Sequence, residues 1–189
     1  MITINQKIPD MELKAYDPVK DEEKDVKLSG FAGKWLVMIF YPADFTFICP
    51  TELEEAAMHY DEFKKLGAEI VTVSTDKVET HKAWHDTSPA IKKVKYLMIA
   101  DPTAKLCREF GTYIEDEGKS LRGTFIINPQ GLVKTIEIHH NDIGRSTDEL
   151  LRKLQAAIYV SKHKGLVCPA SWEPGEKTLK PGLDLVGKI

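Results

Sequence analysis

The sequence predicts an α/β fold in which a mixed central β-sheet is flanked by helices. Three observations lead to this prediction. Continuous apolar runs alternate with segments of helical period, a turn sequence joins two later strands as a hairpin, and a further helix follows that hairpin. Strands that are apolar on both faces belong to a sheet covered by helices on both sides. A chain of 189 residues can bury such a core without metal or disulfide bridges.

Three runs of apolar and β-branched residues predict the buried strands. They span residues 34–41, 70–74 and 96–100, and Pro42 ends the first of them. The segment 17–27 is densely charged and contains a proline, so we interpret it as a surface loop or the tip of a hairpin.

Apolar residues at helical spacing predict a helix after each of these strands. The first helix begins after Pro50, and the second spans about residues 78–86. The third is expected to start with Asp101 as its N-cap and Pro102 in its first turn, and Gly111 is expected to close it.

The second half of the chain predicts a hairpin and a last helix. Strands are expected over residues 124–127 and 132–139, because the sequence Asn-Pro-Gln-Gly between them is typical of a turn. A capping box at residues 146–149 then begins a helix that carries leucine and isoleucine on one face.

The last part of the chain is predicted to be irregular, because it is rich in proline and glycine. It also contains Cys168 and Trp172. We therefore expect a folded domain over residues 1–165 and a C-terminal tail over residues 166–189.

Charge and composition exclude several classes of function. The net charge of −3 gives no general basic field for nucleic acid. No apolar stretch approaches the ~20 residues that span a bilayer, and the first residues do not have the pattern of a signal peptide. We expect a cytoplasmic protein. Three cysteines, an odd number, then fit thiol chemistry better than a disulfide framework.

Cys49 is the candidate nucleophile. It lies where a buried strand has ended and a helix begins, and with Pro50 at the first helical position it occupies the expected N-cap. The positive end of the helix dipole there favours a thiolate. Glu52 and its acidic neighbours in the first turns repel that thiolate, so the site needs a cation from elsewhere in the chain. The alternative is that Cys49 is a small buried hydrophobic residue.

A longer motif around Cys49 resembles a known family. Residues 42–49 match the pattern P-x-x-x-T-x-x-C of the peroxiredoxins, and residues 40–52 resemble the typical two-cysteine branch, of the alkyl hydroperoxide reductase C type. Similar stretches continue along nearly the whole chain, at residues 81–85, 100–102, 121–127, 144–146 and 167–170. The resemblance implies a thioredoxin-like fold for residues 1–165, with a tail that carries the resolving cysteine.

The resemblance also implies roles for the residues around the nucleophile. Cys49 is the peroxidatic cysteine, which peroxide oxidises to a sulfenic acid. Thr46 hydrogen-bonds both thiolate and peroxide, since a hydroxyl donates and accepts. Pro42 shields the site from water. Arg122 supplies the missing cation and polarises the O–O bond.

Two further residues and the tail complete the implied mechanism. Arg145 and Glu52 form a charge network that holds the first arginine in place. Cys168 is the resolving cysteine, which condenses with the sulfenic acid of a partner protomer and makes an intersubunit disulfide. Cys107 matches no part of the motif set, and we interpret it as structural and inert.

The implied activity is a thiol-dependent peroxidase that reduces hydrogen peroxide and organic hydroperoxides to water or alcohols in antioxidant defence. The expected assembly is a homodimer that forms a decamer of five dimers. A thioredoxin-like protein and a flavoprotein reductase are both suitable electron donors. A chaperone-like oligomer is a second hypothesis. A general disulfide oxidoreductase is disfavoured, because position 52 holds Glu52 where a Cys-x-x-Cys motif needs cysteine.

No cofactor or metal is expected. The sequence has no glycine-rich phosphate loop and no dinucleotide fingerprint, so the chain is not expected to bind flavin or nicotinamide itself. His139 and His140 are adjacent, and neighbouring residues of a strand point to opposite faces, so we assign no metal to them.

Overall fold

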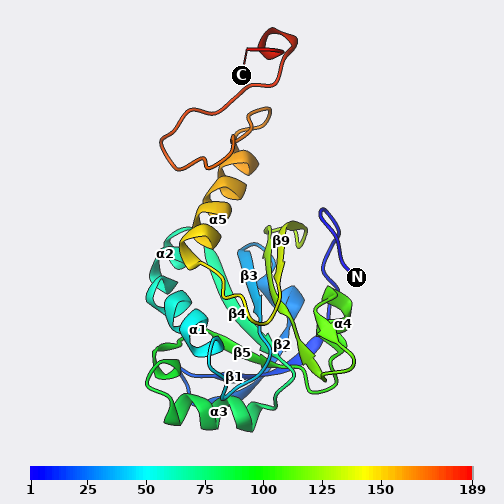
Figure 1. The fold of residues 1–189 in the computed structure, drawn as a ribbon, viewed down its shortest axis with the longest axis vertical. Helices are drawn as coiled ribbons and strands as arrows, with labels where there is room; N and C mark the ends of the chain where they lie inside the picture. The colour runs from blue at the N-terminus through cyan, green and yellow to red at the C-terminus, as the bar shows by residue number, and fades with distance from the viewer. Residues whose placement is uncertain (189) are drawn as a thin grey trace. The chain divides into compact units, whose positions relative to one another are not determined.

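The computed structural model describes residues 1–188, which form two compact units, residues 1–147 and the chain from residue 148 onward. The first unit contains a seven-stranded sheet in the order β2-β1-β5-β4-β3-β8-β9 (Figure 1). Its strands are β1 (Glu12–Asp17), β2 (Glu22–Lys27), β3 (Trp35–Phe40), β4 (Ala68–Ser74), β5 (Leu97–Ala100), β8 (Arg122–Ile127) and β9 (Val133–His139). A separate two-stranded hairpin consists of β6 (Tyr113–Ile114) and β7 (Lys119–Ser120).

The sheet is mixed, as predicted. Its centre is parallel, because β3 pairs with β4 and β4 with β5 in the same direction. The remaining pairs are antiparallel, including the hairpin of β8 and β9. All six residues of β3 are buried, which confirms that this apolar run is a strand covered on both faces.

Helices of the first unit connect these strands. They are α1 (Cys49–Met58), α2 (Tyr60–Lys65), α3 (Val78–Thr87) and α4 (Lys105–Phe110), with short 3₁₀ turns at Leu28–Phe31 and Ile91–Lys93. Helix α2 packs on β4, and α3 packs on β1 and β5. The helix predicted after Pro50 is divided in two, since His59 leaves the helical conformation between α1 and α2.

Two other predictions about local structure need correction. The charged segment 17–27 is a hairpin, but it contains the whole of strand β2 as well as the turn. The helix predicted to begin at Asp101 starts only at Lys105. Asp101 still caps it, because its carboxylate accepts a 2.7 Å hydrogen bond from the backbone N–H of Cys107, in the first turn. Gly111 ends this helix in a left-handed conformation, as predicted.

An aromatic cluster fixes the end of β3 from which the functional loop departs. The ring of Phe40 lies 5.1 Å from that of Phe110 and 5.4 Å from that of Phe125, and the latter two rings are 4.8 Å apart. All three side chains are fully buried. Such packing holds the loop at residues 41–48 on a rigid base.

The second unit consists of α5 (Thr147–Lys162) and an irregular tail with one 3₁₀ turn at Leu183–Leu185. The helix begins within the predicted capping box. Leu150, Leu154 and Ile158, which form its predicted apolar face, are buried. Because the second unit begins at Asp148, the division lies at the first residue of the helix. The predicted domain end at residue 165 stays a prediction, and Ile189 lies outside the described residues.

The helices of residues 1–188 include none that is both long and apolar enough to cross a membrane.

Candidate active site

Cys49 is the first residue of α1, and its side chain is fully buried. The sequence placed it one position earlier, at the N-cap. That position belongs to Ile48, whose carbonyl accepts the first helical bonds, from Thr51 at 3.0 Å and Glu52 at 3.3 Å. Pro50 therefore occupies the second helical position, where its missing N–H is still without consequence for the helix. The sulfur keeps its place at the positive end of the helix dipole.

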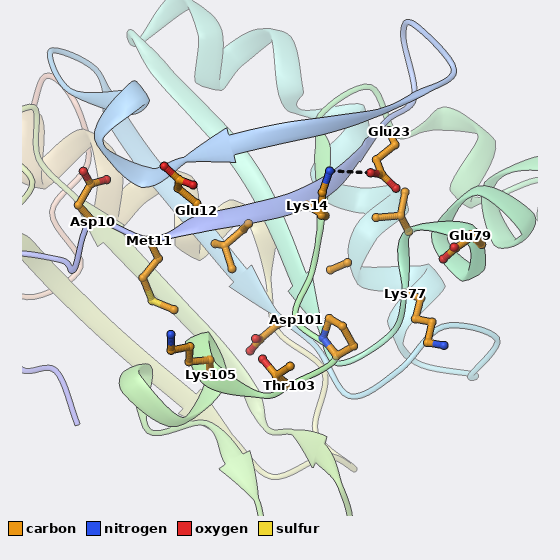
Figure 2. Close-up of a pocket in the computed structure, with 14 residues that line it drawn as sticks. Asp10, Met11, Glu12, Lys14, Glu23, Lys77, Glu79, Asp101, Thr103 and Lys105 are labelled. Atoms are coloured by element: carbon orange, nitrogen blue, oxygen red, sulfur yellow. Dashed lines mark ion pairs between the residues drawn. The ribbon is translucent and has the colours of Figure 1, made fainter.

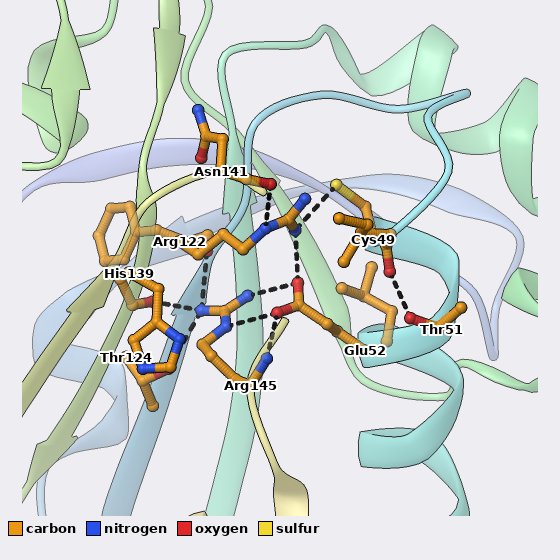
Figure 3. Close-up of polar contacts among 12 residues, drawn as sticks. Cys49, Thr51, Glu52, Arg122, Thr124, His139, Asn141 and Arg145 are labelled. Carbon is orange, nitrogen blue, oxygen red and sulfur yellow. Dashed lines mark hydrogen bonds and ion pairs between the residues drawn. The ribbon is translucent and has the colours of Figure 1, made fainter. Parts of the chain in front are cut away.

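Arg122 is the cation that lies against this sulfur. It is 3 % exposed at the start of β8, and its Nη1 donates hydrogen bonds to Cys49 Sγ at 3.4 Å and to Glu52 Oε2 at 2.6 Å (Figure 3). Its Nε donates to the carbonyl of Asn141 at 2.9 Å, which fixes the plane of the guanidinium. The structure thus brings together a buried sulfur and a buried arginine that are far apart in sequence.

Arg145 binds the same carboxylate through a fork of two hydrogen bonds. Its Nε and Nη2 donate to the two oxygens of Glu52, each at 2.9 Å. Its Nη1 donates to the carbonyls of Phe40 at 2.9 Å and Gly123 at 2.8 Å (Figure 3). This arginine therefore ties helix α1 to the ends of strands β3 and β8, and it fixes the carboxylate that in turn orients Arg122.

Two guanidinium groups and one carboxylate give this network a net positive charge next to the sulfur. Burial opposes ionisation of Glu52, but the hydrogen bonds and charge of Arg145, together with the charge of Arg122, outweigh it and lower the pKa of this carboxyl. Glu52 is therefore an anion at neutral pH between two guanidinium cations. The repulsion that the sequence indicated between Glu52 and a thiolate is neutralised, and the surplus cation is the one that contacts Cys49.

The loop before Cys49 contains the two other predicted site residues. Pro42 is buried beside the end of β3, as a shielding residue must be. Thr46 is half-buried, but its hydroxyl donates to the carbonyl of Ala43 at 2.8 Å, and the predicted hydrogen bond to Cys49 is not formed. The reason is local, because Phe45 adopts a left-handed conformation with φ 56° and turns the chain back toward that carbonyl. The lone pairs of the Thr46 hydroxyl remain available to accept a hydrogen bond from a bound peroxide.

A buried polar group beneath the same loop was missed by sequence reasoning. Asp44 accepts hydrogen bonds from the hydroxyl of Tyr41 at 2.7 Å and contacts Nδ1 of His81 at 2.7 Å, and its backbone N–H donates to Asp76 at 2.8 Å. Burial raises the pKa of Asp44 and that of Tyr41. The side chains of Asp44 and His81 are wholly buried, and they lie 37 residues apart in sequence. No spacing rule connects them, so only the fold reveals that this group anchors the loop to helix α3, through His81, and to Asp76, just after strand β4.

The other two cysteines differ in their surroundings. Cys107 is buried in α4, and burial, followed by the negative charge of Asp101, raises the pKa of its thiol. Cys168 is half-buried in the second unit. The pairing of Cys168 with Cys49 stays a prediction.

Cys107 is expected to resist thiol reagents in the folded protein, because the neutral thiol is a poor nucleophile. One hour with excess iodoacetamide at pH 8, followed by peptide mass spectrometry, should show Cys168 alkylated and Cys107 unmodified. The same treatment in 6–8 M urea, roughly the range that unfolds most domains, should modify both. Equal labelling of Cys107 and Cys168 without urea would contradict its assignment as an inert residue.

A pocket of about 580 Å³ lies apart from this site. It is lined by charged side chains of both signs, among them the ion pair of Lys14 and Glu23, and it contains none of the residues around Cys49 (Figure 2). Within residues 1–188, no group of three or more His, Cys, Asp or Glu side chains is arranged to hold a metal ion. The absence of metals and cofactors remains an expectation from the sequence.

The fold and the site define a class of protein. It is an α/β protein with a mixed sheet, and a cysteine at the start of a helix accepts a hydrogen bond from a buried arginine. Comparison with known proteins is more specific. Residues 4–136 match the AhpC/TSA family, and residues 157–186 match the C-terminal domain of 1-Cys peroxiredoxin. The chain belongs to the AhpC/TSA family, which confirms the resemblance found in the sequence.

Individual relatives span the whole chain. The curated protein alkyl hydroperoxide reductase C of Pseudomonas aeruginosa is 52 % identical over 189 residues, which cover all of both chains. The protein of the same name from Staphylococcus haemolyticus is 50 % identical with the same coverage.

Among solved structures, AhpC of Enterococcus faecalis has a TM-score of 0.85 and 44 % identity, covering 89 % of this chain and 100 % of that one. The reduced 2-Cys peroxiredoxin of Plasmodium vivax has a TM-score of 0.91 and 31 % identity, covering 97 % and 96 %. These likenesses confirm the predicted thioredoxin-like fold.

Proposed function

We propose that this chain reduces hydrogen peroxide and organic hydroperoxides through Cys49, and that Cys168 resolves the oxidised enzyme. The peroxidase class agrees with the relatives named alkyl hydroperoxide reductase C and 2-Cys peroxiredoxin. The observation that carries the residue assignment is the 3.4 Å hydrogen bond from Arg122 Nη1 to Cys49 Sγ, in a buried site with one surplus positive charge.

The first step is attack by the Cys49 thiolate on the terminal oxygen of the peroxide. An S–O bond forms and the O–O bond breaks, and the departing hydroxide or alkoxide takes up a proton and leaves as water or alcohol. Arg122 stabilises the thiolate before the reaction and the negative charge that moves onto the leaving oxygen during it. Thr46 accepts a hydrogen bond from the peroxide, and Pro42 excludes water.

The second step is formation of a disulfide between Cys49 and Cys168 of a partner protomer. The thiolate of Cys168 attacks the sulfenic sulfur, the S–O bond breaks, and the hydroxide takes up a proton and leaves as water. Because a disulfide brings the two Cα atoms to roughly 4.4–6.8 Å, a fully buried Cys49 has to leave its place. The first turn of α1 therefore unwinds in each catalytic cycle.

The family supports a proposal for the assembly and for the electron donor. Its members form dimers and larger oligomers and depend on a reductase. For this chain we propose a homodimer that assembles into a decamer, reduced by a thioredoxin-like protein or a flavoprotein reductase. We also propose a cytoplasmic location, where reduced thiols persist.

A non-reducing gel tests both cysteine assignments. After one equivalent of hydrogen peroxide, the wild type should run as a disulfide-linked dimer, and Cys168→Ser should run as a monomer although Cys49 still becomes oxidised. Cys107→Ser is the matched control and should behave like the wild type. A covalent dimer in Cys168→Ser would exclude this cysteine as the resolving residue.

A further inference from the structure

We propose that Thr112 is a positioning residue for Arg122, because it fixes the turn from which this arginine reaches the sulfur of Cys49. The inference rests on the proposed function of Cys49 and Arg122 and extends it to a buried residue between helix α4 and strand β6. All the groups involved belong to residues 1–147, the first unit of the structure.

A three-residue turn carries Arg122. The backbone N–H of Gly123 donates to the carbonyl of Leu121 at 3.0 Å, so Arg122 is the central residue of this turn. The side chain leaves the turn, and its guanidinium donates to Cys49 and to Glu52. These contacts hold the end of the arginine side chain, whereas the turn sets the place from which the side chain starts.

Thr112 holds the turn through its backbone and its hydroxyl. Its carbonyl accepts a 2.6 Å hydrogen bond from the backbone N–H of Leu121. Its hydroxyl lies 2.8 Å from the hydroxyl of Ser120, which donates to it, and itself donates to the carbonyl of Cys107 at 3.3 Å. Thr112 and Ser120 are fully buried, and hydrogen bonds are stronger away from solvent. Thr112 therefore ties the turn to helix α4.

The methyl group of Thr112 is the second hold on the turn, because it packs against Gly123. A Cβ atom added at Gly123 would lie 2.6 Å from Cγ2 of Thr112 and 3.0 Å from Cε2 of Phe125. Carbon atoms in favourable contact are roughly 3.5–4.0 Å apart. The φ of Gly123 is not positive, so the lack of space alone favours glycine at this position.

A small displacement of the turn is sufficient to separate Arg122 from Cys49. Nη1 of Arg122 donates to Glu52 at 2.6 Å and to Cys49 Sγ at 3.4 Å, so the bond to the carboxylate is the shorter and stronger of the two. When the start of the side chain moves, the guanidinium keeps the carboxylate and loses the sulfur. Misplacement of a reacting group by about 1 Å lowers a rate by up to roughly 100-fold.

Gly123→Ala tests this hold, because the added methyl group has to displace either the turn or Thr112. After one addition of peroxide, rapid quenching and mass spectrometry should show Cys49 oxidised about 30-fold more slowly than in the wild type. The pH midpoint for alkylation of Cys49 by iodoacetamide should rise by about one unit, since loss of the cation disfavours the thiolate. A loss of stability that leaves Arg122 in place would not move this midpoint.

The double variant Thr112→Ser, Gly123→Ala should restore the contact. Serine keeps the hydroxyl but removes the methyl group nearest to the added Cβ atom, so only the ring of Phe125 has to yield, by a few tenths of an ångström. The rate of Cys49 oxidation should return to within about three-fold of the wild type, because the two neighbouring substitutions compensate each other. The pH midpoint should return with it. A double variant as slow as Gly123→Ala would overturn the inference.

Thr112→Val covers the case in which Gly123→Ala does not fold. Valine keeps the shape of the threonine but loses both hydrogen bonds of the hydroxyl, and it needs no new space. It should oxidise Cys49 about three-fold more slowly, the effect of losing roughly one net hydrogen bond from the turn. A wild-type rate and midpoint in Thr112→Val, or in a folded Gly123→Ala, would overturn the inference.

Gly30→Ala is the matched control. A Cβ atom at Gly30 meets no other atom within 4 Å, and the φ of this glycine is not positive. The variant should oxidise Cys49 at the wild-type rate, with the wild-type pH midpoint.

Failure of the proposed function gives a different result. If Cys49→Ser still consumed peroxide at the wild-type rate, the nucleophile would be another group. The pH midpoint would still report the contact between Arg122 and Cys49, since alkylation needs no peroxidase activity. If Cys49→Ser were inactive while Gly123→Ala behaved like the wild type, only the role of Thr112 would fall.

Discussion

Cys49→Ser is expected to reduce the rate of peroxide consumption by about 1,000-fold or more, because a serine hydroxyl cannot replace the thiolate as nucleophile. The serine fits the site, which is fully buried around a side chain of similar size. The fold should therefore survive, and circular dichroism should be unchanged. The measurement is the decay of hydrogen peroxide with a chemical reductant, so that the result does not depend on the unidentified electron donor.

Cys107→Ser provides the matched control for this experiment. Cys107 is also buried, but it lies in α4 and belongs to the hydrophobic core. Its variant should keep most of the wild-type rate. If Cys49→Ser consumed peroxide at a tenth of the wild-type rate or more, the nucleophile would be another group, and the assignment from the arginine contact would be wrong.

Arg145→Met is expected to destabilise the first unit by about 3–5 kcal/mol, the usual loss when one partner of a buried ion pair is removed. The side chain of Arg145 is 7 % exposed, and that of Glu52 is 6 % exposed. The substitution removes a hydrogen-bond donor from both carboxylate oxygens of Glu52 and from the carbonyls of Phe40 and Gly123. The midpoint of urea unfolding under reducing conditions should fall, with the slope of the transition unchanged.

Arg108→Met is the control for a solvent-exposed arginine. Arg108 pairs with Glu115, and the two side chains are 48 % and 67 % exposed. Exposed pairs contribute roughly 0–1 kcal/mol, so this variant should lose far less stability than Arg145→Met. If both variants lost the same free energy of unfolding, burial would not make the Glu52 ion pairs more stabilising than an exposed pair.

The effect of Arg145→Met should also depend on pH. The pKa of Glu52 is lowered in the folded chain, so its ion pairs contribute their full stability above the unfolded pKa of about 4.3. That contribution is lost as the pH falls through the lower, folded pKa. The difference in stability between wild type and Arg145→Met should therefore be largest near neutral pH and should shrink in strong acid. A difference that stayed constant to pH 2–3, about where the carboxylates are protonated, would contradict the role of Glu52.

Local patterns were sufficient for most of the secondary structure. The apolar run of β3, the turn between β8 and β9, and the capping box of α5 all predicted elements that the structure contains. The errors lie where tertiary contacts override local signals. Helix α4 starts late because Asp101 bonds to the third residue of the helix from outside it. The strand β2 escaped prediction because its residues are nearly all charged and exposed, and only its pairing with β1 makes it a strand.

The sequence alone showed the family, and it predicted the nucleophile and the need for a cation, because the strand, the loop motif and the start of the helix around Cys49 are contiguous in the chain. The family resemblance named Arg122 as this cation, but no local pattern around Cys49 places an arginine against the sulfur. Arg122 and Arg145 lie 70 and 93 residues from Glu52, and only the pairing of β3 with β8 brings all three to one end of the sheet. The tertiary structure likewise decided three other contacts. They are the hydrogen bond from the Thr46 hydroxyl to the carbonyl of Ala43, the buried pair of Asp44 and His81, and the hydrogen bond from Arg152 to the carbonyl of Trp172. A hydrogen bond depends on the distance between two groups in space, and a local sequence pattern contains no information about that distance.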